Sequence, residues 1–353
     1  MAAIQPVVLI PGLGIDDKVV IETDAAGPAN AFDHIASWIK GIFGSQIHIE
    51  KSDREERNLG LVRNLETAGS ASSVGIKLPR HLDAGLISVF LYDWQAEIQT
   101  SAARLSEALE SLSKETGGRL VDLVCHGTGG LVARYYIESG KFRSAKEMVG
   151  RLILIGVPNY GIPLAFSALL NILKKTGKPE DTLRSLVAVA PALFQLLPPT
   201  GHPFIYLSDD PVLKVEIYRT PHLWGARAPG TMPAKDKEGE LPAPPVPDDV
   251  LFRIAELNAS LHGKLKGYYH FMWRNTFCLV GTGFDTMVQM IFDFDSRCYL
   301  QKSAEPSVAA GDGIVPWGSA LLYPSVKYMP MHSEHARFFE HGSMLELLSR
   351  LLN

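Results

Sequence analysis

Short, mostly aliphatic runs recur along the first half of the chain, and segments with helical spacing separate them. The runs are 7–10, 86–91, 120–124 and 152–155. Runs of this kind, without regular polar alternation, are typical of strands buried on both faces of a parallel sheet. Between them, 31–43 and 102–112 place apolar residues on one face of a helix. This alternation predicts an α/β fold with a doubly wound, mostly parallel sheet.

The pattern changes after Gly161, where a long apolar stretch with helical spacing begins. Strand-type sequence returns at 276–280. The length of 353 residues suits one large domain that carries an insertion. We therefore predict a core made of 1–160 and 276–353, with a helical cap inserted at about 161–275.

Composition excludes several classes of function. The net charge of -4 offers nothing that would attract nucleic acid or anionic lipid. No apolar run reaches the ~18–20 residues of a membrane span, so we expect no stable membrane insertion. The three cysteines are too scattered for a disulfide framework or a zinc site, and we expect no metal and no cofactor. Met1 is followed almost at once by a strand candidate, without signal-peptide features, so we expect a cytoplasmic protein with reduced thiols.

The stretch 123–134, with the sequence LVCHGTGGLVAR, joins a strand candidate to a helix candidate through a tight turn. A nucleophile elbow, G-x-S-x-G, needs this context, because it forces its central residue into a strained backbone conformation. Small residues two positions to either side let the strand and the helix approach each other. Cys125 and Gly129 are small enough for this, but the central residue is Gly127 rather than serine.

This stretch resembles the HSxGGLVAR elbow of lipases, in particular the lecithin:cholesterol acyltransferase-like and lysosomal phospholipase-like branch of the α/β-hydrolases. Other segments resemble further motifs of that branch, in the same order along nearly the whole chain. They are VLIPGLG at 8–14, YDWQ at 92–95, IGVPNYG at 155–161, QLLP at 195–198, GDGIVP at 311–316 and SEH at 333–335. One departure is Gln95, which stands where the branch usually has arginine. The resemblance implies an α/β-hydrolase fold.

The resemblance also implies a catalytic triad in the chain order Ser, Asp, His. Position 127, Asp312 and His335 keep this order. Asp312 would be the acid, although an Asp-Gly pair also forms ordinary turns. His335 would be the base, because it falls where the branch's motif has its histidine. His332 and His341 are the rival candidates.

The oxyanion hole of this fold uses two backbone N–H groups. One belongs to the residue after the nucleophile, here Thr128, and the other to the residue after Pro-Gly in the first loop, here Leu13. We do not expect the Thr128 hydroxyl to act as nucleophile, because a side chain at the start of the helix would point away from the base. His126 is expected to be a structural neighbour of the elbow rather than a base.

A glycine at position 127 has no nucleophilic atom, so an acyl-enzyme cannot form there. One explanation is an engineered, inactivated form of a serine enzyme, which would hold uncleaved substrate. The other is a natural pseudo-hydrolase that binds a hydrophobic ligand. Retention of Asp312, His335 and the oxyanion loop favours the first explanation. Activation of water by His335 alone would give feeble hydrolysis at most.

The predicted cap is rich in apolar side chains. They include Leu164, Phe166, Leu169, Leu170, Ile172, Leu173, Val187, Leu193 and Phe194. Most of these residues are expected to pack the cap onto the core, yet an apolar cap also favours a small lipophilic ester or lactone as substrate. The sequence therefore predicts an esterase, lipase or lactonase that uses a Ser-Asp-His triad, and predicts that this form is inactive or nearly so. An acyltransferase is the alternative, because the sequence does not say whether water or an alcohol receives the acyl group.

Overall fold

The computed structural model describes most of the chain. The described residues are 5–12, 18–23, 31–43, 48–53, 60–62, 87–142, 145–210, 212–225, 246–265, 274–293, 298–303, 311–322 and 326–352. Leu13, one of the two predicted oxyanion residues, lies outside these ranges.

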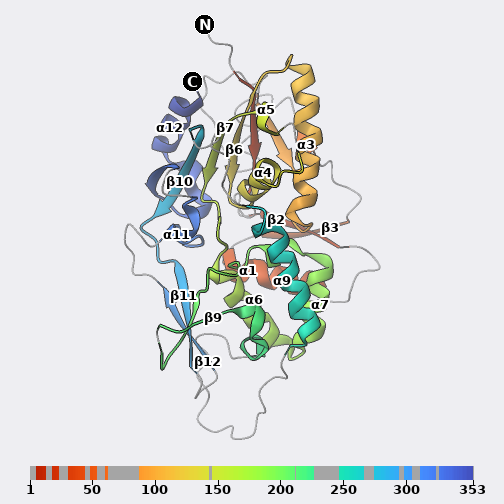
Figure 1. Ribbon diagram of the computed structural model, residues 1–353, viewed down its shortest axis with the longest axis vertical. Coiled ribbons are helices and arrows are strands. Elements are labelled where there is room, and N and C mark those ends of the chain that lie inside the picture. Colours follow the sequence, from red (N-terminus) through yellow and green to blue (C-terminus); the bar gives the residue numbers. More distant parts are fainter. Residues whose placement is uncertain are drawn as a thin grey trace, which may run out of the picture.

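A seven-stranded sheet forms the centre of the fold (Figure 1). Its strands are β1 (Val7–Ile10), β4 (Gly60–Val62), β5 (Ile87–Leu91), β6 (Val121–His126), β7 (Val149–Ile155), β10 (Thr276–Thr282) and β13 (Lys327–His332). They lie in the order β13-β10-β7-β6-β1-β5-β4. All neighbours are parallel except β4 and β5, which pair antiparallel. This is the predicted mostly parallel, doubly wound sheet of an α/β-hydrolase fold.

Apolar layers cover both faces of the sheet, as a parallel sheet requires. Successive side chains of a strand point to opposite faces. Accordingly, Val8 belongs to one buried cluster with Leu105 of α3 (Ile98–Glu115), on the face that α4 (Thr128–Glu138) also covers. Leu9 belongs to a second cluster with Phe338 of η5 (His335–Glu340) and Leu348 of α12 (Gly342–Leu352). The short helices α5 (Ala145–Met148) and α11 (Trp317–Ala320) complete the core.

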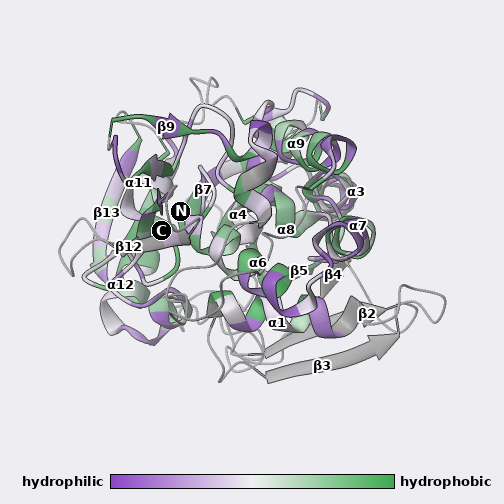
Figure 2. Cartoon of the chain, turned by 90° about the horizontal axis from the view of Figure 1, so that it is seen from below, coloured by the Kyte–Doolittle hydropathy of each residue, from purple (hydrophilic) through white to green (hydrophobic). Residues whose placement is uncertain are grey.

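The inserted segment is mainly helical at its start, as predicted. Its helices are α6 (Pro163–Thr176), α7 (Pro179–Val189), α8 (Ala192–Gln195), η3 (Ile217–Arg219), η4 (Pro221–Gly225) and α9 (Asp248–His262). In Figure 2, α6 is mostly green, hence hydrophobic, whereas α3 and α7 carry both colours. Helix α1 (Ala31–Phe43) packs against α6, where the Trp38 indole N–H donates a hydrogen bond of 2.8 Å to the Ala165 carbonyl.

Two smaller sheets accompany the main one. β2 (Lys18–Thr23) pairs parallel with β3 (His48–Asp53). The second consists of β8 (Ile205–Leu207), β9 (Lys214–Val215), β11 (Met287–Asp293) and β12 (Cys298–Ser303), in the order β12-β11-β8-β9. Here β11, from the segment assigned to the core, pairs parallel with β8 of the predicted cap. The two segments therefore share a sheet, and the domain boundaries stay a prediction.

The strand order has a topological switch point beside β1. After β1 the chain reaches β5 on one side, and it later enters β6 on the other side. The connections that leave β1 and β6 therefore run in different directions, and α/β sheets bind ligands at such switch points, beyond the carboxyl ends of the strands. Pro11 follows β1 and Gly127 follows β6 at this edge.

Within the described part of the chain, no helix combines the length and the apolar sequence that crossing a bilayer requires. Cys125 and Cys278 are buried free thiols, and burial raises the pKa of the Cys278 thiol to about 11. The cytoplasmic location stays a prediction.

Candidate active site

Gly127 forms a sharp turn between β6 and α4. Its backbone has φ 48° and ψ −126°, and its N–H donates to the Ile155 carbonyl at 3.0 Å. A positive φ of this kind is strained for any residue other than glycine, by about 1–3 kcal/mol. The turn therefore has the backbone conformation that the central residue of a nucleophile elbow adopts, and glycine adopts it without this strain.

Gly129 and Gly130 follow the turn, where the helix passes very close to the end of β1 and to the loop after β7. A Cβ on Gly129 would lie 2.3 Å from the Ile10 carbonyl oxygen, and one on Gly130 would lie 2.2 Å from a methyl carbon of Val157. Either substitution would push the start of α4 away from the sheet. The small residue expected at position 129 is thus needed for this close approach.

Asp312 and His335 meet at the carboxyl edge of the sheet. Their side chains are joined by a hydrogen bond of 2.8 Å between Asp312 Oδ2 and His335 Nδ1. The other carboxylate oxygen accepts bonds from the backbone N–H groups of Ile314 at 3.0 Å and Val315 at 2.7 Å. The backbone N–H of His335 also donates to the Asp312 carbonyl at 2.9 Å. These bonds fix the carboxylate and the imidazole relative to each other.

The imidazole of His335 faces position 127. A Cβ built on Gly127 would lie 3.2 Å from His335 Nε2. Nδ1 is bound to Asp312, so Nε2 is the ring nitrogen that faces a side chain at position 127. The structure thus brings together the three positions that the sequence predicted as a triad, and their catalytic roles stay a prediction.

The other histidines near the site have different surroundings. His332 is exposed at the end of β13 and stacks on Phe284, with ring centroids 5.0 Å apart. His126 is fully buried, and its Nε2–H donates to the His335 carbonyl at 2.9 Å. Burial holds the pKa of His126 well below its usual value. His126 is therefore a neutral neighbour that supports the backbone of His335, as the sequence predicted.

Tyr92 is a part of the site to which the sequence analysis gave no role. Its hydroxyl lies 2.9 Å from the Pro11 carbonyl and 3.0 Å from Thr128 Oγ1. Because a carbonyl only accepts, Tyr92 donates to Pro11 and accepts from the Thr128 hydroxyl. Tyr92 directly follows the strand that pairs with β1. This position in the sequence indicated that its side chain lies at the same edge of the sheet as Pro11.

A buried ion pair anchors the elbow helix. Arg134 of α4 is 1% exposed and donates to both carboxylate oxygens of Glu138, at 2.7 and 3.0 Å. It also donates to Asn159 Oδ1 at 3.0 Å, and the Asn159 amide donates to the Ala320 carbonyl at 2.9 Å. These contacts join two of the motifs, at 123–134 and 155–161, through their side chains.

A small apolar cavity of about 10 Å³ adjoins Thr128. Its lining residues are Tyr92, Trp94, Ala96, Ile98, Thr128, Ala192, Leu193 and Leu196. A volume of this size is that of about one water molecule or methyl group. Helix α8 thus limits the apolar space on this side of the turn. In the described part of the chain, no group of three His, Cys, Asp or Glu side chains is arranged to hold a metal ion.

Neither protein-family models nor curated protein sequences give a match. Among solved structures, that of the Tle4–Tli4 complex is 13% identical, covering 76% of this chain and 68% of that chain, with a TM-score of 0.49. The mature Bacillus licheniformis lipase BlEst2 is 12% identical over 100% of this chain and 94% of its own, with a TM-score of 0.41. A thermostable carboxyl esterase from Bacillus coagulans is 13% identical over 99% and 91%, with a TM-score of 0.32. Likeness at these TM-scores says nothing about activity.

Proposed function

We propose that the chain has the architecture of a serine-type carboxylic-ester hydrolase in which Gly127 occupies the nucleophile position. Asp312 is the acid, His335 the base, and the backbone N–H groups of Thr128 and Leu13 form the oxyanion hole. One observation carries the proposal: the turn at Gly127 directs a side chain at this position toward Nε2 of His335, which lies 3.2 Å from the Cβ position. Membership of the lecithin:cholesterol acyltransferase-like branch stays a prediction from the sequence motifs.

The chemistry follows from this geometry if a serine stands at position 127. Its Oγ, one bond beyond Cβ, can rotate to within the hydrogen-bond range of about 2.6–3.2 Å that activation by a base requires. His335 takes the hydroxyl proton as Oγ attacks the ester carbonyl, and the oxyanion accepts bonds from the backbone N–H groups. The proton then passes to the leaving alcohol, and water releases the acid from the acyl-enzyme. With glycine none of these steps can start, so this form is expected to be inactive or nearly so.

The proposed substrate is a small lipophilic ester or lactone. The apolar side chains of α6 and α8 and the apolar cavity beside Thr128 support this class. Transfer of the acyl group to an alcohol instead of water, and binding of a hydrophobic ligand without turnover, are the alternatives that the following experiment separates.

The test compares Gly127→Ser with Gly127→Ala, which adds a Cβ but no nucleophile. We expect the serine variant to hydrolyse p-nitrophenyl esters at least about 10³-fold faster than the alanine variant and to be labelled by a fluorophosphonate. Asp312→Asn and His335→Ala in the serine background should each remove most of this activity. A serine variant that stays inert and unlabelled would contradict the proposed triad. Product analysis with an added alcohol identifies acyl transfer.

The same variants carry a stability prediction. Serine and alanine at position 127 must both adopt φ near 48° and place Cβ 3.2 Å from His335 Nε2. We therefore expect each to lower the free energy of unfolding by about 1–3 kcal/mol relative to glycine, measured by urea denaturation. Equal stability of all three proteins would mean that the turn relaxes, and that the elbow geometry described above is not maintained with a side chain.

A further inference from the structure

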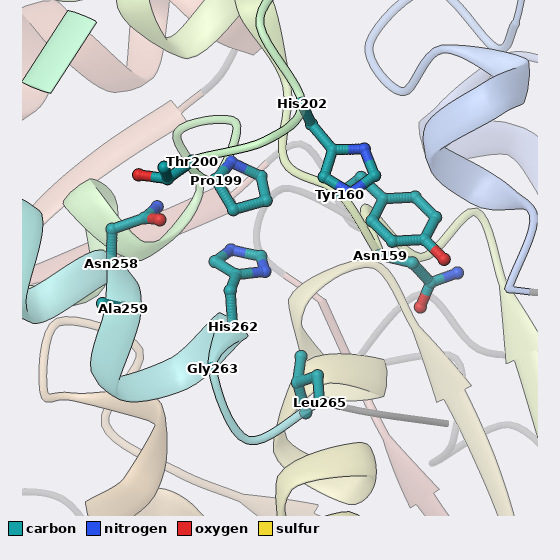
Figure 3. Close-up of a pocket in the computed structure, with 10 residues that line it drawn as sticks. All are labelled: Asn159, Tyr160, Pro199, Thr200, His202, Asn258, Ala259, His262, Gly263 and Leu265. Carbon is teal, nitrogen blue, oxygen red and sulfur yellow. The ribbon is translucent and has the colours of Figure 1, made fainter. Parts of the chain in front are cut away.

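A second and larger cavity, of about 300 Å³, lies apart from the candidate triad. It is enclosed by the loop after β7, the segment between α8 and β8, and the carboxyl end of α9 (Figure 3). Its lining residues are Asn159, Tyr160, Pro199, Thr200, His202, Asn258, Ala259, His262, Gly263 and Leu265. None of the residues proposed for catalysis is among them.

Asn258 contributes a hydrogen-bond acceptor to this cavity. Its side-chain amide donates to the carbonyls of Phe194 at 3.2 Å and Leu197 at 2.8 Å, so both amide hydrogens are used. Two carbonyl partners also fix the orientation of the amide, because a carbonyl cannot donate. Asn258 is 2% exposed and lines the cavity, and no described residue donates a hydrogen bond to its Oδ1, so this oxygen is the acceptor that Asn258 offers to a ligand.

His262 contributes a second acceptor. Its ring projects from the end of α9 toward Pro199 (Figure 3), and its Nε2–H donates to the Gln195 carbonyl at 2.9 Å. Burial lowers the pKa of His262 to about 4, so the ring is neutral near pH 7. With the proton fixed on Nε2, Nδ1 carries a lone pair, and no described residue donates to it.

Among the described residues, the lining contains no Asp, Glu, Lys or Arg. A carboxylate or ammonium ligand would therefore find no oppositely charged side chain among the described lining residues. Tyr160 and His202 form a flat stacked wall, with ring centroids 4.4 Å apart and 17° between their planes. The carboxyl end of α9, with its partial negative charge, adds to the preference for hydrogen-bond donors. The cavity therefore suits a neutral ligand that supplies O–H donors.

We propose that this cavity binds a small neutral polyol, two of whose hydroxyl groups donate to Asn258 Oδ1 and His262 Nδ1. Its volume of about 300 Å³ is many times the roughly 10–15 Å³ that a single water molecule needs, which leaves room for a compound of four to six carbons. The carbon skeleton of the polyol packs against Tyr160 and Pro199. Binding here does not depend on the residue at position 127.

The experiment is a titration of the whole protein with erythritol, in which calorimetry and saturation-transfer NMR measure binding. The matched probe is 1,2-dimethoxyethane, a neutral compound of four carbons whose oxygens can accept but not donate. We expect saturable binding of erythritol and no binding of the diether. His262→Phe, which keeps a ring but removes the acceptor, should weaken erythritol binding about tenfold.

A second variant keeps the test valid if His262→Phe is poorly folded. Ala259→Leu puts a larger side chain into the cavity without removing any of its hydrogen bonds, and circular dichroism checks its fold. It should abolish erythritol binding. Equal binding of the diether, unchanged binding by Ala259→Leu, or tighter binding of protonated ethanolamine than of erythritol would each overturn the proposal. These measurements involve no catalysis, so they are independent of the proposed hydrolase activity.

Discussion

Tyr92 connects two segments of the candidate site that are far apart in the sequence. Thr128 donates to the Tyr92 oxygen, and Tyr92 donates to the Pro11 carbonyl. Thr128 and Leu13, the second residue after Pro11, are the proposed sources of the two oxyanion N–H groups. Burial raises the pKa of the Tyr92 phenol, so the hydroxyl keeps its proton at all working pH values. We infer that Tyr92 positions the oxyanion hole.

In the Gly127→Ser background, we expect Tyr92→Phe to lower kcat about tenfold while KM stays nearly unchanged. The reason is that oxyanion donors act mainly on the transition state, where small displacements have large effects. Steady-state kinetics with a p-nitrophenyl ester measures the split. The control is Tyr299→Phe, because Tyr299 is also buried and also donates to a carbonyl, that of Leu223 at 3.1 Å. A similar loss of kcat in both variants would show that Tyr92 only stabilises the fold and does not specifically position the oxyanion hole.

At the scale of helices and strands, periodicity predicted which elements form but not where they end. Helix α3 was expected from residue 102 and begins at Ile98. The reason is a tertiary contact: the Gln195 side chain of α8 accepts a 2.8 Å bond from the Ile98 N–H and so fixes the first turn. The pairing of β11 with β8 was missed for a similar reason, since the partner strand lies far away in the sequence and no local signal marks it.

The candidate site was predictable where motifs fix both residue type and order. Gly127, Asp312 and His335 were predicted from their motifs and lie together, with the imidazole between the other two positions. Tyr92 was not given a role, because its two hydrogen bonds span 36 and 81 residues and depend on strand order. The hydrogen-bond acceptor that Asn258 offers to the cavity could not be predicted from the sequence, since the tertiary fold decides which acceptors have a donor nearby.

Helix α8 sets the size of the apolar space beside Thr128. Leu196 is 4% exposed and lines the cavity of about 10 Å³. In the Gly127→Ser background, we expect Leu196→Ala to shift the preference among p-nitrophenyl esters toward acyl chains longer by about two to three carbons, because three carbon atoms of the wall are removed. Ratios of kcat/KM across the ester series measure the shift.

The control for this prediction is Leu186→Ala, which removes an equally buried leucine of α7 outside the cavity. Both variants should lose about 2–5 kcal/mol of stability, the usual effect of such a truncation, so assays are done well below the unfolding temperature. An unchanged ester profile in Leu196→Ala would place the acyl chain elsewhere in the site.

At the scale of the whole molecule, core and insertion share one continuous apolar cluster. Leu105 of α3, Trp38 of α1 and Phe166 of α6 all belong to it.

The sheet also buries polar side chains. The one with the largest expected effect on stability is Asp122 in β6, which is 1% exposed. Its Oδ1 accepts the Arg151 backbone N–H at 2.8 Å, and its Oδ2 lies 3.7 Å from the Arg151 guanidinium. Burial outweighs these contacts and raises the pKa of Asp122 to about 6.

This raised pKa makes the stability of the whole molecule depend on pH. Between the ordinary value of 3.8 and about 6, the folded chain holds a proton at Asp122 that the unfolded chain has lost, so this group destabilises the fold as pH rises through that window. Asp122→Asn keeps the acceptor for Arg151 and removes the titration. We therefore expect its gain in unfolding free energy over the parent to grow from near zero at pH 4 to at most about 3 kcal/mol at pH 7. Urea denaturation at several pH values measures the difference.

The contrasting variant is Asp249→Asn. The exposed Asp249 carboxylate accepts a hydrogen bond from Arg184, which lowers the pKa of Asp249. Loss of this carboxylate should therefore change stability with pH in the opposite direction. A gain for Asp122→Asn that does not change with pH would mean that Asp122 stays charged in the fold.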